Sequence, residues 1–183
     1  KISEIKAGIN SVFLVRYILE KCKTVKESIS ALQALPVSSS CNILIADKSG
    51  EMVVMECNPH KKFIRYPETN RFGNKFIITV NQLLSPEMIE HDASDKNAYF
   101  SKERYATAYN ALSNMNNSPI EQTKNILGGK CGFMCQYAKE LNFETIWASI
   151  FNLSDLTICR SEGNPSKCTF ITDNRLKDCK CKQ

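Results

Sequence analysis

Apolar residues in the first third of the chain recur with two different periods. Residues 8–22 predict a helix, because apolar side chains return every three or four positions. They are Val12, Val15, Ile18, Leu19 and Cys22. A second helix is predicted from Thr24 to Leu35, since Thr24 is a good N-cap and Glu27, three residues later, completes a capping box. Pro36 ends that helix.

Strand patterns follow the two helices. CNILIAD (41–47) and EMVVMEC (51–57) surround the sequence DKSG, which predicts a β-hairpin. Residues 76–80, FIITV, are β-branched or aromatic and predict a buried strand. Asn81 and Gln82 follow this strand directly, with no turn residue between. Two amides at the end of a core strand require an explanation.

The rest of the chain alternates between the two kinds of element. A helix is predicted over residues 101–115, and Ser118-Pro119 opens a shorter one that stops at Gly128. Residues 144–160 predict two strands around NLSD, and a last strand lies near residues 168–172. Paired antiparallel strands and clustered helices predict an α+β fold.

Composition excludes several classes of protein. The chain has 183 residues, 43% of them hydrophobic, which suits one globular domain. Its net charge of +5 is spread along the chain, so we expect no nucleic-acid partner. No apolar run reaches the ~20 residues that cross a membrane, so we expect no membrane partner. The basic, cysteine-containing tail, residues 174–183, is the only stretch dense in Lys.

Nine cysteines leave two interpretations open. Cys41 and Cys57 lie in segments with a strand pattern, where a free thiol packs as a small hydrophobic group. This favours structural thiols in a reducing cytoplasm. Two pairs, Cys131/Cys135 and Cys179/Cys181, could together supply four thiolates to a metal ion. A thiol-rich metal-binding protein is therefore a third functional hypothesis, although the second pair is closer than is usual for zinc.

Self-contained catalytic signatures are absent from the sequence. It contains no GxSxG, P-loop, GxGxxG or HExxH motif. The residues of this chain alone therefore do not predict a complete active site.

The order of five segments does resemble a known family. They are GINSVFLVRYILEKCKTVKESISALQALP, CNILIADKSGEMVVMECNP, ITVNQLLSPEM, YFSKERYATAYNAL and ETIWASIFNLSDLTICRSEGNP. Across residues 8–165 the chain resembles the later two-thirds of the acyl-CoA:6-aminopenicillanic acid acyltransferase-like family. That family is grouped with the choloylglycine hydrolases and penicillin V acylases among the N-terminal-nucleophile hydrolases.

The resemblance implies an architecture and a missing part. Residues 1–183 would form a single domain of two packed antiparallel sheets flanked by helices, the αββα arrangement, with its front part absent. The catalytic Cys, made N-terminal by autoproteolytic processing, would lie in a segment outside this chain. None of the nine cysteines occupies a matching context.

Two site residues follow from the resemblance. Family members carry Asn-His after this strand, and the Asn side chain donates to the oxyanion; here the pair is Asn81-Gln82. The motif S-x-x-R, which ends at Arg104, matches a family motif whose Arg supports the charged state of the nucleophile. The alternatives are that Asn81 caps the following turn and that Arg104 forms an ordinary surface pair. Trp147 is expected in the core.

The implied function is a cysteine-dependent amide (C–N) hydrolase or acyltransferase that works through an acyl-enzyme. The substrate would be a small-molecule acyl amide or thioester, and the second partner would be the nucleophile-bearing segment of the same protein. No metal or organic cofactor is implied, and homo-oligomer formation is left open. The alternative from another class is a non-catalytic binding or assembly domain of the same fold.

Overall fold

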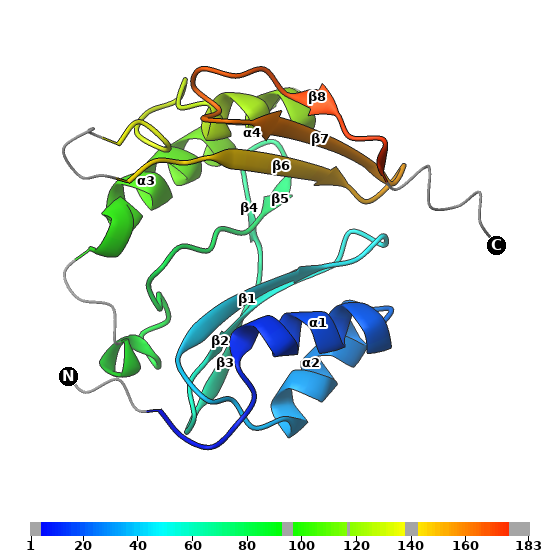
Figure 1. Ribbon diagram of the computed structural model, residues 1–183, viewed down its shortest axis with the longest axis vertical. Helices are drawn as coiled ribbons and strands as arrows, with labels where there is room; N and C mark the ends of the chain where they lie inside the picture. The colour runs from blue at the N-terminus through cyan, green and yellow to red at the C-terminus, as the bar shows by residue number, and fades with distance from the viewer. Residues whose placement is uncertain (1–4, 93–96, 117, 138–142, 176–183) are drawn as a thin grey trace. The chain divides into compact units, whose positions relative to one another are not determined.

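The computed structural model describes residues 5–92, 97–116, 118–137 and 143–175. They group into two compact units (Figure 1). The first unit comprises Lys1–Thr69 and Lys75–Tyr105, and the second comprises Asn70–Asn74 and Ala106–Gln183. The expected single domain stays a prediction.

The first unit is a layer of two helices on an antiparallel sheet (Figure 1). Its elements are α1 (Ser11–Lys21), α2 (Val25–Ala34), β1 (Cys41–Ala46), β2 (Met52–Cys57) and β3 (Lys62–Arg65), with strand order β1-β2-β3. Both predicted helices and the predicted hairpin are confirmed. The core lies between the helices and the sheet, and Leu14, Leu32, Met55 and Cys57 are fully buried in it.

The predicted buried face of α1 is wrong in part. Leu14 and Ile18 face the core, whereas the Val12 and Leu19 side chains are 71% and 76% exposed. This helix is apolar around most of its circumference, so spacing alone does not decide which stripe packs. The stripe that includes Leu14 and Ile18, four residues apart, contacts the sheet.

The predicted strand over residues 76–80 is also shorter than expected. Only Lys75–Phe76 forms a strand, β5, which pairs with β4 (Glu68–Thr69). Among the described residues no strand pairs with residues 77–80. A strand exists only as part of a ladder, so β-propensity alone could not extend β5. Side chains of the first sheet, Asn42 and Arg65, donate hydrogen bonds to carbonyls of this segment instead.

The second unit has the same α+β character. Its helices are α3 (Ser101–Ser113), whose first turns belong to the first unit, and α4 (Pro119–Leu127). Its sheet has the order β6-β7-β8, with bounds Trp147–Asn152, Thr157–Glu162 and Ile171–Thr172, and α4 packs on β6. The antiparallel sheets with flanking helices confirm the α+β class.

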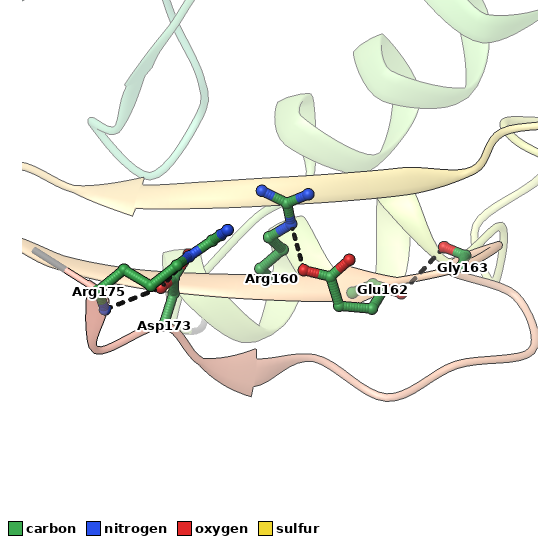
Figure 2. Close-up of polar contacts among 6 residues, drawn as sticks. Arg160, Glu162, Gly163, Asp173 and Arg175 are labelled. Carbon is green, nitrogen blue, oxygen red and sulfur yellow. Dashed lines mark hydrogen bonds and ion pairs between the residues drawn. The ribbon is translucent and has the colours of Figure 1, made fainter.

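Trp147 does not lie in the core, which corrects our expectation. Its side chain is 51% exposed, and the guanidinium of Arg160 lies 5.0 Å from the centre of its ring. Arg160 pairs with Glu162 at 2.7 Å, and a second pair joins Arg175 to Asp173 (Figure 2). Because Trp147 and Arg160 share a face of the sheet, the indole stabilises the cation rather than filling the core.

Two further expectations concern membranes and metals. No described helix has both the length and the apolar character needed to traverse a lipid bilayer. Within the described residues no three His, Cys, Asp or Glu side chains are grouped to hold a metal ion. Cys135 is buried and Cys131 exposed, while Cys179 and Cys181 lie outside the described residues.

Local hydrogen bonds explain where α2 begins. The Thr24 Oγ1 accepts from the Glu27 N–H at 3.2 Å, as the capping box predicts, and the Glu27 carboxylate accepts from the Lys23 N–H at 2.7 Å. Asp47, in the hairpin turn, adds a second cap because it accepts from the Val25 N–H at 2.9 Å. Hydrogen bonds from the Ser49 hydroxyl and then from Val25 lower the pKa of Asp47.

We expect Asp47→Asn to destabilise the protein in a pH-dependent way. A carboxylate whose folded pKa is lowered stabilises the fold above its unfolded pKa, 3.8 in this case, and loses that contribution as the pH falls through the folded value. Thermal unfolding should therefore show a lower Tm for the variant near pH 7 and a shrinking difference below pH 3.8. Glu51→Gln, an exposed carboxylate in the same turn, is the control. A difference that is constant across this range would contradict the assignment.

Candidate functional site

Three polar side chains cross the face of the first sheet that carries no helices. They are Asn42 on β1, Glu56 on β2 and Arg65 on β3, one from each strand. Asn42 is directly opposite Glu56 in the ladder, and Arg65 is opposite Val54, two residues from Glu56 on the same face. We call this set the polar row.

Glu56 is the centre of the polar row. Its side chain is fully buried, and its Oε1 lies 2.8 Å from the Nε of Arg65 in an ion pair. The same carboxylate accepts the backbone N–H groups of Leu84 at 2.9 Å and Ser85 at 3.0 Å. Arg65 donates in turn to the carbonyl of Ile78 at 2.5 Å. A buried charge is tolerated only with such partners. The Glu56 carboxylate therefore fixes the backbone at Leu84 and Ser85, which follow Asn81 in the sequence.

Asn42 fixes the backbone immediately around Asn81. Its Nδ2 donates to the carbonyl of Val80 and to the carbonyl of Gln82, each at 2.8 Å. These two carbonyls lie on either side of Asn81. The polar row thus replaces the missing ladder: side chains, rather than a neighbouring strand, hold residues 78–85 over the sheet.

Arg104 reaches Asn81 from the first turns of α3. Its Nη2 donates to the Oδ1 of Asn81 at 2.6 Å. The guanidinium is held in place because its Nε donates to the carbonyl of Tyr99 at 2.9 Å and Nη2 to the Oγ of buried Ser101 at 3.3 Å. An amide side chain has one acceptor end and one donor end. With Oδ1 occupied, the Nδ2 of Asn81 remains as the donor, and it has no acceptor among the described residues.

The start of α3 is shaped by a short irregular segment. Asn97, Tyr99 and Phe100 have positive φ values of 62°, 55° and 56°. The Oδ1 of Asn97 accepts from the Lys102 N–H at 2.7 Å, and its Nδ2 donates to Glu103 at 2.7 Å, which lowers the pKa of that carboxyl. Left-handed backbone at non-glycine residues is costly and is frequent at functional sites. This segment sets the direction of the Tyr99 carbonyl that holds Arg104.

A cavity of about 350 Å³ lies beside Asn81. Its lining includes Cys41, Asn42, Asn81 and Gln82. Pockets that bind small molecules have volumes of roughly 300–1,000 Å³ and a few convergent polar groups. The cavity therefore has the size and polarity of a small-molecule site, with amide donors in its wall.

A comparison with known protein families shows the family of the chain. The family model for acyl-coenzyme A:6-aminopenicillanic acid acyl-transferase matches residues 2–167. The chain belongs to this family. This acyltransferase family has the N-terminal-nucleophile hydrolase type of fold, which agrees with the α+β architecture. A search of curated proteins found no match.

The structure brings together the two site residues that were inferred separately from the sequence. Asn81 and Arg104 are 23 positions apart in the acyltransferase-family chain and are hydrogen-bonded. Gln82, the residue that follows Asn81, lines the same cavity. Trp147 belongs to the other unit. The catalytic roles of Asn81 and Arg104 stay predictions.

Sequence reasoning missed Asn42 and Glu56. Glu56 is the one charge in the apolar strand MVVMEC, and Asn42 is the one polar side chain in CNILIA. A polar residue inside a core strand requires a partner when buried, so both were detectable as signals. Their backbone partners, 28 to 40 residues away, were not, because nothing local indicates them.

We expect Glu56→Ala to destabilise the first unit by about 3–5 kcal/mol, because removal of one partner leaves a largely buried Arg65 without compensation. Urea unfolding would measure the change. Glu51→Ala, in the adjacent turn and exposed, should change stability by no more than about 0.5 kcal/mol. Equal effects of the two variants would show that the buried carboxylate anchors nothing.

Proposed function

We propose that this chain is part of a cysteine-dependent acyltransferase or amide hydrolase whose nucleophile lies in a segment outside residues 1–183. The Cys thiolate attacks an amide or thioester carbonyl, and the free α-amine of that same Cys acts as the base. An acyl-enzyme forms, and water or an amine then takes the acyl group. Membership of the acyltransferase family supports this reaction class.

The observation that carries the proposal is the hydrogen bond between Arg104 and Asn81. It fixes which end of the Asn81 amide can donate, because the guanidinium occupies Oδ1. A nearby positive charge also polarises the amide and makes its N–H groups better donors. A fixed donor at a cavity wall is what stabilisation of an oxyanion requires, since it needs little reorganisation as charge develops.

Asn42 and Glu56 support this donor without taking part in the chemistry. Asn42 holds the carbonyls on both sides of Asn81, and Glu56 holds the two N–H groups that follow. Donors placed on a rigid backbone retain their geometry during the reaction. We assign both as positioning residues.

The second role proposed for Arg104 is electrostatic. Its guanidinium is permanently charged, and a cation near a thiol lowers the thiol pKa and increases the thiolate fraction. Asn81 and Arg104 would then act together: Arg104 favours the nucleophile's charged form and orients the oxyanion donor.

The substrate proposed is a small acyl amide or thioester. The cavity of about 350 Å³ accommodates a small ligand, and its amides can bind a carbonyl oxygen without carrying charge. Gln82 in place of the family His removes a titratable group from the cavity. The proposed site therefore relies on the nucleophile's own α-amine for proton transfer.

Substitution of Asn81 tests the oxyanion role. In the protein that carries its nucleophile segment, Asn81→Ala should lower acyl-transfer turnover by roughly 10²–10³-fold, the usual loss for one oxyanion donor. Asn81→Asp is the second variant, because it keeps an acceptor for Arg104 while it removes the donor end and adds a negative charge beside the proposed oxyanion position. It should lose at least as much turnover as Asn81→Ala, while its Tm is unchanged or higher because the pair with Arg104 is kept.

Gln82→Ala is the matched control, since the neighbouring amide lines the same cavity and should matter far less for turnover. If Asn81→Asp retains wild-type turnover, Asn81 serves only as a partner of Arg104 and as a turn residue. N-terminal sequencing and intact mass of the native protein then decide between the classes: a Cys-initiated partner segment supports the enzyme, and its absence supports a non-catalytic binding domain.

Arg104 has its own test. Arg104→Ala should slow alkylation of the nucleophilic thiol near neutral pH, because a raised thiol pKa leaves less thiolate. The rate measured against pH should shift to higher pH, whereas Arg71→Ala, an exposed Arg in the other unit, should leave the profile in place. An unchanged profile in Arg104→Ala would limit Arg104 to the orientation of Asn81.

A further inference from the structure

Two cysteines face each other at the open end of the first hairpin. Cys41 is the first residue of β1, Cys57 is the last residue of β2, and the two are direct partners in the ladder. They form the rung next to the Asn42–Glu56 rung, and their side chains lie on the opposite face of the sheet from the polar row, toward the core. Both are free thiols.

The two thiols differ in access. Cys57 is fully buried in the core, whereas Cys41 is partly exposed and contributes to the lining of the cavity beside Asn81. The thiol–thiol hydrogen bond lowers the pKa of Cys41, and the same bond together with burial raises the pKa of Cys57. Reactivity of cysteines follows thiolate character and exposure, and both favour Cys41 as the thiol that is oxidised first.

We propose that Cys41 and Cys57 form an oxidisable dithiol, in which a hydroperoxide oxidises Cys41 and Cys57 then closes a cross-strand disulfide. In the first step the Cys41 sulfur attacks the O–O bond and becomes a sulfenic acid, and an alcohol or water leaves. In the second step the Cys57 thiol displaces water from that sulfenic acid. Overall, two thiols and one hydroperoxide give one disulfide, one alcohol and one water, so two electrons pass from the sulfurs to the O–O bond.

The register makes closure feasible at a small cost. Direct cross-strand partners have Cβ atoms about 4.5–5.5 Å apart, and a disulfide needs about 3.5–4.5 Å. The strand ends must therefore approach each other slightly, and this is easiest at the last rung of the ladder, where the pair lies. A bond formed under such constraint is readily reduced, so the modification is reversible.

Formation of the disulfide can be measured independently of the proposed catalysis, although Cys41 lines the cavity beside Asn81. Closure would constrain the rung beside Asn42 and Glu56, which hold the backbone around Asn81. Any effect on turnover rests on the proposed function, whereas formation of the disulfide does not.

Peptide mapping of the protein after mild oxidation tests the proposal. Trypsin cleaves after Lys26, Lys48 and Lys61, so Cys41 and Cys57 fall in separate peptides, 27–48 and 49–61. After treatment with hydrogen peroxide and alkylation of the remaining thiols, these two peptides should be recovered linked and should separate on reduction. The link should form at least about tenfold faster than Cys22 is lost, since that half-buried cysteine of the same unit lies at the end of a helix rather than in the ladder.

Three variants sharpen the result. Cys57→Ser should leave a sulfenic acid at Cys41 that dimedone traps, whereas Cys41→Ser should leave Cys57 reduced. Cys22→Ser is the matched control and should form the link at the wild-type rate. Recovery of unlinked peptides at a peroxide dose that fully oxidises exposed Cys131 would overturn the proposal. The wild-type measurement decides even if the Cys57 variant fails to fold.

Discussion

The buried carboxylate of Glu56 is the constraint on which the candidate site depends. A charge placed in the central strand of a sheet must be compensated, and here the partners are a guanidinium and two backbone N–H groups from a distant segment. Because the buried carboxylate requires these partners, residues 78–85 must follow one path over the sheet. Asn42 completes the arrangement on the other side of Asn81.

Local features of the fold were predictable from the sequence, and non-local ones were not. The capping box joins Thr24 to Glu27, three positions apart, and the other helix start depends on the adjacent residues Ser118 and Pro119; the structure confirms the helices that they open. The path of residues 77–80 depends on side chains from two different strands, Asn42 on β1 and Arg65 on β3, so their β-propensity predicted a ladder that does not form. Similarly, apolar spacing did not indicate which stripe of α1 packs or that Trp147 lies beneath a guanidinium.

The candidate site was predictable to a different extent. The family resemblance indicated Asn81 and Arg104 one by one, because each matches a short motif. Their contact requires the irregular turn at Tyr99 and Phe100, whose positive φ values no residue type there suggests. The structure adds the contact between the two residues, which no motif contains. Arg104 donates to Asn81 and so fixes the orientation of its amide, and this contact links the two inferred roles. Membership of the acyltransferase family gives the reaction class, and the positions of these side chains support a specific division of labour.

The polar row also has a consequence for the order of folding. Asn42, Glu56 and Arg65 come from three strands, so they lie in line only after the whole β1-β2-β3 meander has paired in register. Local hairpin contacts form faster than distant ones, since loop closure costs more entropy for longer separations. We therefore expect the backbone that carries Asn81 to become ordered after the sheet on which it lies. Substitutions in the hairpin would then change the folding rate, whereas substitutions in residues 78–85 would change mainly the unfolding rate.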